Sequence, residues 1–295
     1  MTGDDASRAV LDKAARENFP VAPVFLPRAW RQDLMAVYGF ARLVDDIGDG
    51  DLADGGRPDA RHLGLDPAAA EDRVAMLDAF EADLRRVFDG TPRHPLLTAL
   101  QPTVRRQHLT PEPFLGLIAA NRQDQVVRRY ASYEELLAYC ELSANPVGRL
   151  VLSITGTSTP ERVRQSDAVC TALQIVEHLQ DVAEDLGRDR IYLPADDMKR
   201  FSVDEADLAA PSAGAQVRAL IAFEAERARA LLDEGTPLVG SVRGRLRLLL
   251  AGFVGGGRAA LEAVRSAGYD VLAGSPKATK PGLLRAVGST LRREG

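Results

Sequence analysis

Residues 35–49 read MAVYGFARLVDDIGD, and this stretch decides the fold class because its apolar residues recur at intervals of three and four. An α-helix completes a turn in about 3.6 residues, so this spacing places them on one helix face. The residues concerned are Val37, Phe40, Ala41 and Val44. The same spacing recurs over 136–143 and 173–182, and no stretch shows the alternation of a strand between hairpin turns. The sequence therefore predicts an all-α protein.

The composition is that of a globular protein that does not bind nucleic acid. Of 295 residues, 45% are hydrophobic and 27% are charged, which is enough to form a substantial core. The formal net charge is −5 and only 5% of residues are aromatic. A nucleic-acid-binding surface is usually basic and offers aromatic rings for base stacking. We expect no nucleic-acid partner.

Cysteine usage and hydropathy predict a cytoplasmic location. Cys140 and Cys170 are too few for a disulfide framework, and neither belongs to a CxxC pair. The N-terminal residues lack the apolar core of a secretory signal. The apolar run 248–254 is far shorter than the roughly 20 residues that cross a bilayer. Peripheral association with a membrane stays open, because helices with basic and apolar faces can lie on a bilayer.

The chain contains no internal repeat and no obvious domain linker, so we predict one domain over residues 1–295. Residues 1–14 and 277–295 are expected to be loosely ordered. The stretch 48–67 is dense in Gly, Asp and Pro and is predicted to be a loop. Gly255 begins a run of three glycines that no strand precedes, which favours a kink or a close helix contact over a dinucleotide-binding loop.

Two pairs of aspartates carry the strongest chemical signal. Asp45 and Asp49 lie four residues apart on a predicted helix, and Asp181 and Asp185 repeat the spacing. Such a pair usually lies on a solvated face of its helix. Both pairs here follow apolar helical runs, and like charges at this spacing destabilise a helix by about 0.2–0.5 kcal/mol, which favours a compensating cation.

The two acidic helices predict a magnesium site if they face each other across a bundle. Gln174 and Glu177 extend the face of the second pair. Residues 42–51 carry four Asp and one Arg, and residues 174–189 carry five acidic residues and one Arg, so these segments account for the negative net charge. An oxygen-rich cavity suits Mg²⁺, which binds through carboxylates and substrate phosphates. A diphosphate is the natural ligand of such a cavity.

Four segments resemble the motif blocks of the squalene/phytoene synthase family, in order over about residues 15–275. They are ENFPVA (17–22), YGFARLVDDIGD (38–49), YCELSANPVGRLVL (139–152) and LQDVAEDLGRDRIYLP (179–194). ENFPVA and SANPVGR are similar to the hydroxysqualene synthase branch of the family. The resemblance implies the isoprenoid synthase fold, a helical bundle around a central cavity, and prenyl diphosphate substrates.

The resemblance also implies roles for individual residues. The metal ligands would be Asp45, Asp49, Asp181 and Asp185, with Glu177 adding a carboxylate where many members have Asn. The substrate-binding residues would be Tyr38, Arg42, Ser143, Gln174, Arg190 and Tyr192, the last two on a loop that can close over the diphosphate. Tyr139 and Asn145 would join the aspartates in catalysis. Arg42 could instead pair with Asp45 or Asp46, and Tyr139 could be a core residue. His178 has no partner at a suitable spacing and is expected to be structural or on the surface.

The implied reaction is the Mg²⁺-dependent ionisation of presqualene diphosphate, followed by capture of the cation by water, with no NAD(P)H. Either Ser143 or Asn145 would orient the water. A same-fold alternative is presqualene diphosphate, squalene or phytoene synthesis. A non-catalytic assembly protein of the same fold is a further alternative, although it predicts damaged aspartate motifs. Association with a partner synthase stays open.

Overall fold

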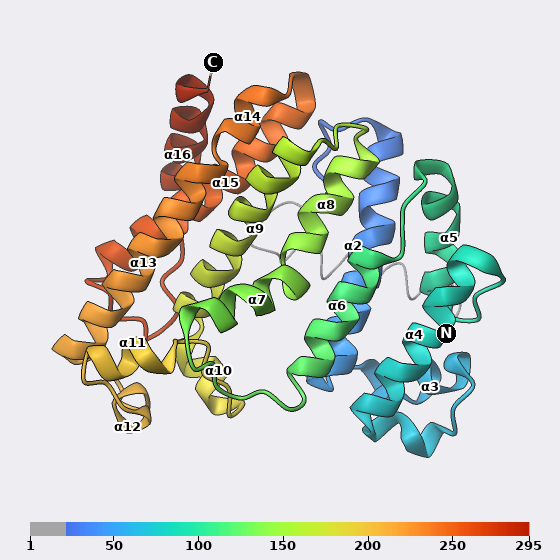
Figure 1. Cartoon of the computed structure of the whole chain (residues 1–295), viewed down its shortest axis with the longest axis horizontal. Coiled ribbons are helices and arrows are strands. Elements are labelled where there is room, and N and C mark those ends of the chain that lie inside the picture. Colours follow the sequence, from blue (N-terminus) through green and yellow to red (C-terminus); the bar gives the residue numbers. More distant parts are fainter. Residues whose placement is uncertain (1–21, 295) are drawn as a thin grey trace. The chain divides into compact units, whose positions relative to one another are not determined.

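The computed structural model describes residues 22–294, and every regular element in this part of the chain is a helix (Figure 1). The nearest approach to a strand is an isolated parallel bridge between Arg129 and Ile191. The all-α prediction is confirmed. The described residues form two compact units, one of 22–126 with 149–158 and the other of 127–148 with 159–294. The single domain stays a prediction.

The first unit packs its helices around α2. Its α-helices are α2 (Arg28–Asp49), α3 (Arg57–Leu63), α4 (Arg73–Asp89), α5 (Pro95–Gln107) and α6 (Glu112–Gln123). Phe40 of α2 stacks on Phe80 of α4 at 5.4 Å between ring centroids and meets Phe114 of α6 edge-on at 5.0 Å. All three rings are fully buried. The predicted apolar face of α2 is therefore the face that forms this core.

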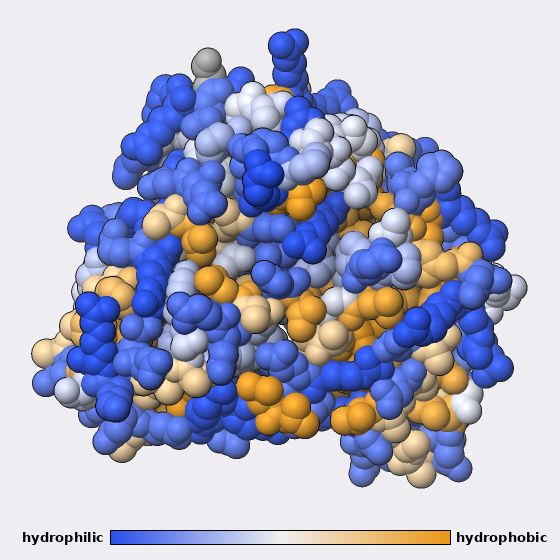
Figure 2. Space-filling model, viewed as in Figure 1, coloured by the Kyte–Doolittle hydropathy of each residue, from blue (hydrophilic) through white to orange (hydrophobic). Residues whose placement is uncertain are grey.

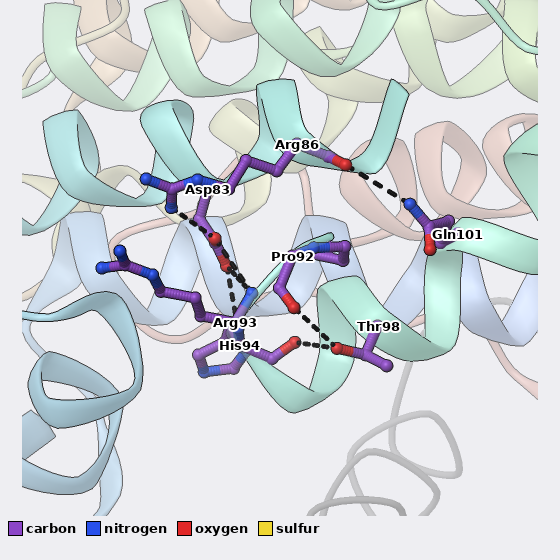
Figure 3. A network of polar contacts seen from close by, with 7 residues as sticks. All are labelled: Asp83, Arg86, Pro92, Arg93, His94, Thr98 and Gln101. Atoms are coloured by element: carbon purple, nitrogen blue, oxygen red, sulfur yellow. Dashed lines mark hydrogen bonds and ion pairs between the residues drawn. The ribbon is translucent and has the colours of Figure 1, made fainter. Parts of the chain in front are cut away.

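A buried carboxylate shapes the turn between α4 and α5. Asp83 is completely buried and accepts hydrogen bonds from the backbone N–H groups of Arg93 and His94, at 2.8–3.0 Å (Figure 3). Arg86 neutralises it at 2.9 Å. Gln101 donates to the carbonyls of Arg86, Val87 and Gly90 at the end of α4, where carbonyl groups run out of partners within the helix. This network fixes how α5 returns along α4.

The prediction of a loop over residues 48–67 is wrong in part. This stretch holds α3 and the 3₁₀-helix η1 (Ala53–Gly56), and η2 (Pro67–Glu71) follows directly. Gly50, Gly56 and Gly64 adopt φ values of 77°, 72° and 83°, a region that residues with a side chain rarely enter. Gly50 ends α2, Gly56 lies between η1 and α3, and Gly64 ends α3, so the composition that suggested a loop instead produces tight turns.

The second unit is built on two long helices, α9 (Pro160–Gln180) and α13 (Ala215–Gly235), which pack along each other. A Cβ at Gly235 would lie 2.6 Å from the carbonyl oxygen of Gln165, so the glycine permits close approach. The other helices are α7 (Tyr133–Ser143), α10 (Val182–Gly187), α11 (Ala195–Arg200), α12 (Glu205–Leu208), α14 (Pro237–Ser241), α15 (Gly244–Ser266) and α16 (Lys280–Arg293). Helix α8 (Asn145–Ile154) begins in this unit and ends in the first.

Two of the three consecutive glycines of α15, Gly255 and Gly257, form close helix contacts, as one of the two sequence interpretations predicted. A Cβ at Gly255 would lie 2.7 Å from the backbone of Val287 in α16. At Gly257 it would lie 2.8 Å from the side chain of Leu173 in α9. Side chains at these positions would push α16 and α9 away from α15.

The prediction of loose order over 277–295 is wrong for α16. Thr279 caps this helix by accepting from the N–H of Gly282 at 3.2 Å, and the buried Thr290 accepts from Arg258 of α15 at 3.0 Å. Residues 1–14, and the ENFPVA segment up to Val21, lie outside the described residues. None of the described helices has an apolar stretch long enough to cross a membrane.

Candidate active site

The first aspartate pair sits on the last turn of α2. The helix is continuous through Asp45 and Asp49, so the two carboxylates lie one turn apart on one face, as predicted. Asp45 is exposed and Asp49 is half-buried. Gly50 ends the helix immediately afterwards in the left-handed region. The pair is thus presented to solvent at a helix end.

Helix α6 holds this end of α2, which sequence analysis missed. Asn121 donates from Nδ2 to Oδ1 of Asp45 at 3.0 Å. Gln125 donates to the carbonyl of Gly48 at 2.9 Å. A Cβ at Gly48 would lie only 2.1 Å from Oδ1 of Asn121, so the lack of a side chain at Gly48 leaves room for the amide. Nothing in the segment NRQDQ marks these amides, because their partners lie more than 70 residues away.

Arg42 takes the alternative partner that the sequence offered. Its Nη2 lies 2.9 Å from Oδ1 of the buried Asp46. Tyr38 lies one turn further back on α2 and is half-buried. Both residues share the helix that carries Asp45, and their predicted contact with substrate stays a prediction.

The second pair does not lie on one unbroken helix, contrary to prediction. Helix α9 ends at Gln180 and α10 begins at Val182, while Asp181 has φ −110° and ψ 17°. The N–H of Asp185 still bonds to the carbonyl of Asp181 at 2.8 Å, so the offset of one turn is kept. The break places Asp181 at the N-terminus of α10 rather than inside α9.

The environment of this pair opposes the accumulation of negative charge. Burial raises the pKa of Asp181 above its usual range, and the carboxylates of Glu184 and Asp185 raise it further, partly offset by a hydrogen bond from Ser275. Nδ1 of His178 lies 3.7 Å from Oδ2 of Asp185. A bound cation would relieve the repulsion between these acids.

Aromatic rings form a wall beside the second pair. His178 and Tyr192 stack at 3.6 Å between centroids with planes 13° apart. Tyr139 lies 5.5 Å from Tyr192, and Tyr130 stacks on Tyr192 at 5.6 Å. Sequence analysis predicted Tyr139 and Tyr192 as site residues. It missed the contribution of His178, because no spacing along the chain reveals a stack with a ring 14 positions later.

A small pocket opens where this wall meets α10. It is lined by Asp185, Arg190, Tyr192 and His178, together with the apolar Val182 and Leu193. Arg190 and Tyr192 are both buried. Their loop is held by backbone hydrogen bonds from Arg190 to Asp185 at 2.8 Å and from Ile191 to Arg128 at 2.9 Å. The structure thus brings together an acid, a guanidinium and a ring from one motif block, Asp185, Arg190 and Tyr192, and adds the ring of His178 from α9.

The other predicted residues of this unit have distinct surroundings. Gln174 lies 3.1 Å from Nε2 of His178, whereas Glu177 is exposed on α9. Asn145 is buried and its Oδ1 accepts from Thr171 at 2.9 Å. The hydroxyl of Ser143 is buried without a hydrogen-bond partner among the described residues. Of the two residues proposed to orient water, Ser143 therefore has the uncommitted group.

A cluster in the first unit, Asp59, His62 and His94, also brings three potential metal-ligand atoms within 4.8 Å of one another. Nε2 of His94 lies 3.0 Å from Asp59, and its Nδ1 accepts from the N–H of Leu96 at 3.3 Å. Both nitrogens are therefore engaged, which makes the cluster a structural link between α3 and the start of α5.

The acidic residues of the two motifs offer only oxygen ligands, the donors that Mg²⁺ prefers. In the first motif, Asp45 is exposed and therefore accessible to an ion. In the second motif, the raised pKa of Asp181 shows that negative charge there is unfavourable without a cation to balance it. The donor set therefore fits a divalent cation.

A model of squalene/phytoene synthases matches residues 12–282. The chain belongs to the squalene/phytoene synthase family. It is 33% identical over 245 residues to a hydroxysqualene synthase of Sinorhizobium fredii, covering 82% of this chain and 77% of that protein. It is 30% identical over 230 residues to a 15-cis-phytoene synthase of Synechococcus elongatus, covering 74% and 70%.

Solved structures of the family share the fold. The squalene synthase HpnC from Alicyclobacillus acidocaldarius has a TM-score of 0.77 and 42% identity, covering 90% of this chain and 94% of that one. A dehydrosqualene synthase has a TM-score of 0.82 at 23% identity, covering 99% and 97%. The chain therefore has the all-α isoprenoid synthase fold, as predicted, and its family acts on prenyl diphosphates.

Proposed function

We propose that the protein is a hydroxysqualene synthase that converts presqualene diphosphate and water to hydroxysqualene and diphosphate. The carbon–oxygen bond to diphosphate breaks and the leaving group keeps the electron pair. The cyclopropylcarbinyl cation then rearranges, a water oxygen bonds to carbon, and the water loses a proton. No electrons are gained or lost overall, so the reaction needs no NAD(P)H.

The observation that carries the proposal is the contact between acid and aromatic groups around Tyr192. Asp185 and Arg190 line the same pocket as the stacked rings of Tyr192 and His178. Arg190 would bind the departing diphosphate through its guanidinium. The electron-rich faces of Tyr192 and Tyr139 would stabilise the allylic or cyclopropyl cation that remains. An acid beside an aromatic wall suits a reaction that separates these charges.

Magnesium would be held by Asp45 and Asp49 in one motif and by Asp181, Asp185 and Glu177 in the other. When bound, it would neutralise the diphosphate charge that grows as the bond breaks. Asn121 would keep Asp45 oriented toward the ion through its hydrogen bond. Tyr38, Arg42 and Gln174 would contact the substrate next to these ligands.

Water capture would depend on the corner between α7 and α8. Ser143 ends α7 with a buried hydroxyl that has no partner in the described part of the chain. Such a group can accept a hydrogen bond from a water and orient its lone pair. Asn145 follows with its amide oxygen engaged by Thr171, so it would shape the corner.

Product analysis from presqualene diphosphate tests the function. With Mg²⁺ and without NADPH, we expect hydroxysqualene and diphosphate in equal amounts. Ser143→Ala should shift the products toward other cation-derived alcohols or alkenes with less effect on substrate consumption. Squalene formed only with NADPH would overturn the water-capture assignment, and an unchanged product ratio in the variant would remove Ser143 from the mechanism.

A second candidate, presqualene diphosphate or phytoene synthesis from two prenyl diphosphates, is favoured by the similarity to phytoene synthases. Incubation with farnesyl or geranylgeranyl diphosphate separates it from the first. A non-catalytic assembly protein is supported less, because both aspartate pairs are intact. The cytoplasmic location that we propose is supported by the two cysteines, Cys140 and Cys170, which are not joined in a disulfide.

A further inference from the structure

The C-terminal helices carry a concentration of positive charge in a chain whose net charge is −5. Residues 237–261 and 271–293 contain nine Lys and Arg and no acidic residue. Some exposed arginines elsewhere pair with carboxylates one turn away, as Arg85 does with Glu81 and Arg229 with Glu226. The segment 271–293 offers no acidic side chain for such pairing.

Helices α15 and α16 run antiparallel, which gathers these charges on one part of the second unit. Gly255 meets Val287, Arg247 donates to the carbonyl of Leu291 at 2.8 Å, and Gly240 approaches Glu294. The start of α15 therefore lies against the end of α16. We name this the C-terminal basic surface. Its exposed cationic residues are Arg243, Arg245, Arg285, Arg292 and Arg293, whereas Lys277 and Lys280 lie at the other end of α16.

Two large apolar side chains are exposed among these cations. Leu284 of α16 is 73% exposed and Leu248 of α15 is 46% exposed. On α16, Arg285 and Arg292 lie two turns apart on the outward face, and Leu284 lies beside Arg285. Figure 2 shows hydrophilic residues, in blue, over the end of α16 that Figure 1 places at the upper left.

We propose that the C-terminal basic surface docks on an anionic phospholipid bilayer. Lysine and arginine side chains are attracted to the negative potential of acidic headgroups, and exposed leucines can enter the apolar boundary below them. Nucleic acid fits this surface less well, because no aromatic side chain lies in 271–293 to stack on bases. Docking does not depend on which prenyl diphosphate the enzyme uses.

Co-sedimentation of the full-length protein with vesicles tests this proposal. We expect binding to phosphatidylcholine vesicles that contain phosphatidylglycerol, weak binding to pure phosphatidylcholine, and release by high salt. Arg285→Gln with Arg292→Gln should lower the partition coefficient roughly 25-fold, since each cation near such a surface contributes roughly fivefold. Leu284→Ser should lower it several-fold without changing the net charge.

The matched control removes two exposed arginines of the first unit, Arg57→Gln with Arg105→Gln, and leaves the same net charge. It should bind vesicles as the unchanged protein does. Equal losses in the two double variants would overturn the proposal, because overall charge would then explain binding. So would failure to bind anionic vesicles at low salt, or binding to duplex DNA that matches vesicle binding and is indifferent to Leu284→Ser.

Discussion

Asn121 and Asp45 are 76 residues apart in sequence, yet the amide of one donates to the carboxylate of the other at 3.0 Å. The Oδ1 of the same amide fills the space in which Gly48 would carry a Cβ. One side chain thus fixes one oxygen of the aspartate and depends on a glycine one turn further along α2. A substitution of Gly48 should therefore disturb the position of the Asp45 carboxylate.

Gly48→Ala should lower activity by on the order of tenfold while the protein stays folded. The new Cβ would lie 2.1 Å from Oδ1 of Asn121, and the end of this flexible side chain would move and release Asp45. Steady-state kinetics with a Mg²⁺ titration measure the effect, and the half-saturating Mg²⁺ concentration should rise. Gly252→Ala is the control, since nothing lies within 4 Å of its Cβ and alanine favours a helix. Identical Mg²⁺ dependence in both variants would contradict the argument.

Replacing an aspartate of either motif should abolish most activity. Asp45→Asn and Asp181→Asn should each reduce kcat/KM by on the order of a hundredfold or more, and the double variant should lose little beyond either, because residues that act as a unit are not additive. Asp54→Asn is the matched control in the same acidic segment. Asp54 has φ 52°, a conformation that asparagine also tolerates. Full activity in either motif variant would remove the proposed metal ligands.

The stack of His178 on Tyr192 predicts an ordered series of variants. His178→Phe keeps a flat ring against Tyr192 but loses the contact with Gln174, while His178→Ala loses both. We expect kcat to be highest for the unchanged protein, lower for His178→Phe and lowest for His178→Ala. His178→Ala should also give more side products, because the aromatic wall beside the cation is then incomplete. Chromatography of the extracted products measures this. A Phe variant as impaired as Ala would assign the effect to the polar contacts of His178 with Gln174 and Asp185 instead of the ring.

Glu224 makes folding stability depend on pH. It is buried on α13 with Arg227 3.1 Å away, and burial raises its pKa to about 7, against the pull of Arg227. At pH values between the ordinary pKa of a glutamate and about 7, Glu224 has lost its carboxyl proton in the unfolded chain but keeps it in the folded protein. The unfolding free energy therefore falls as pH rises through this window, by on the order of 3 kcal/mol for this group.

Glu224→Gln should remove this part of the pH dependence. Urea denaturation at pH values below and above the window measures the change in unfolding free energy for both proteins. We expect the variant to lose less stability at the higher pH than the unchanged protein. Parallel pH profiles would show that Arg227 already keeps Glu224 charged in the folded state.

The sequence predicted what depends on spacing along one helix. The apolar face of α2 and the one-turn offset of Asp45 and Asp49 follow from helical periodicity alone. It could not predict contacts between residues far apart in the sequence, such as the hydrogen bond from Asn121 to Asp45. The helix break at Asp181 was missed because periodicity continues through it, and α16 was missed because its basic composition resembles a solvated tail.

That break gives the two acidic motifs different mechanical properties. Asp45 and Asp49 share a continuous helix, so their separation cannot change unless α2 unwinds. Asp181 and Asp185 are joined through a residue with non-helical dihedral angles, and Asp185 stands on a helix of only six residues. Rotation about the backbone of one residue alters the distance between these carboxylates. The backbone therefore fixes the spacing of the aspartates in the first motif, whereas the spacing of the aspartates in the second motif can change.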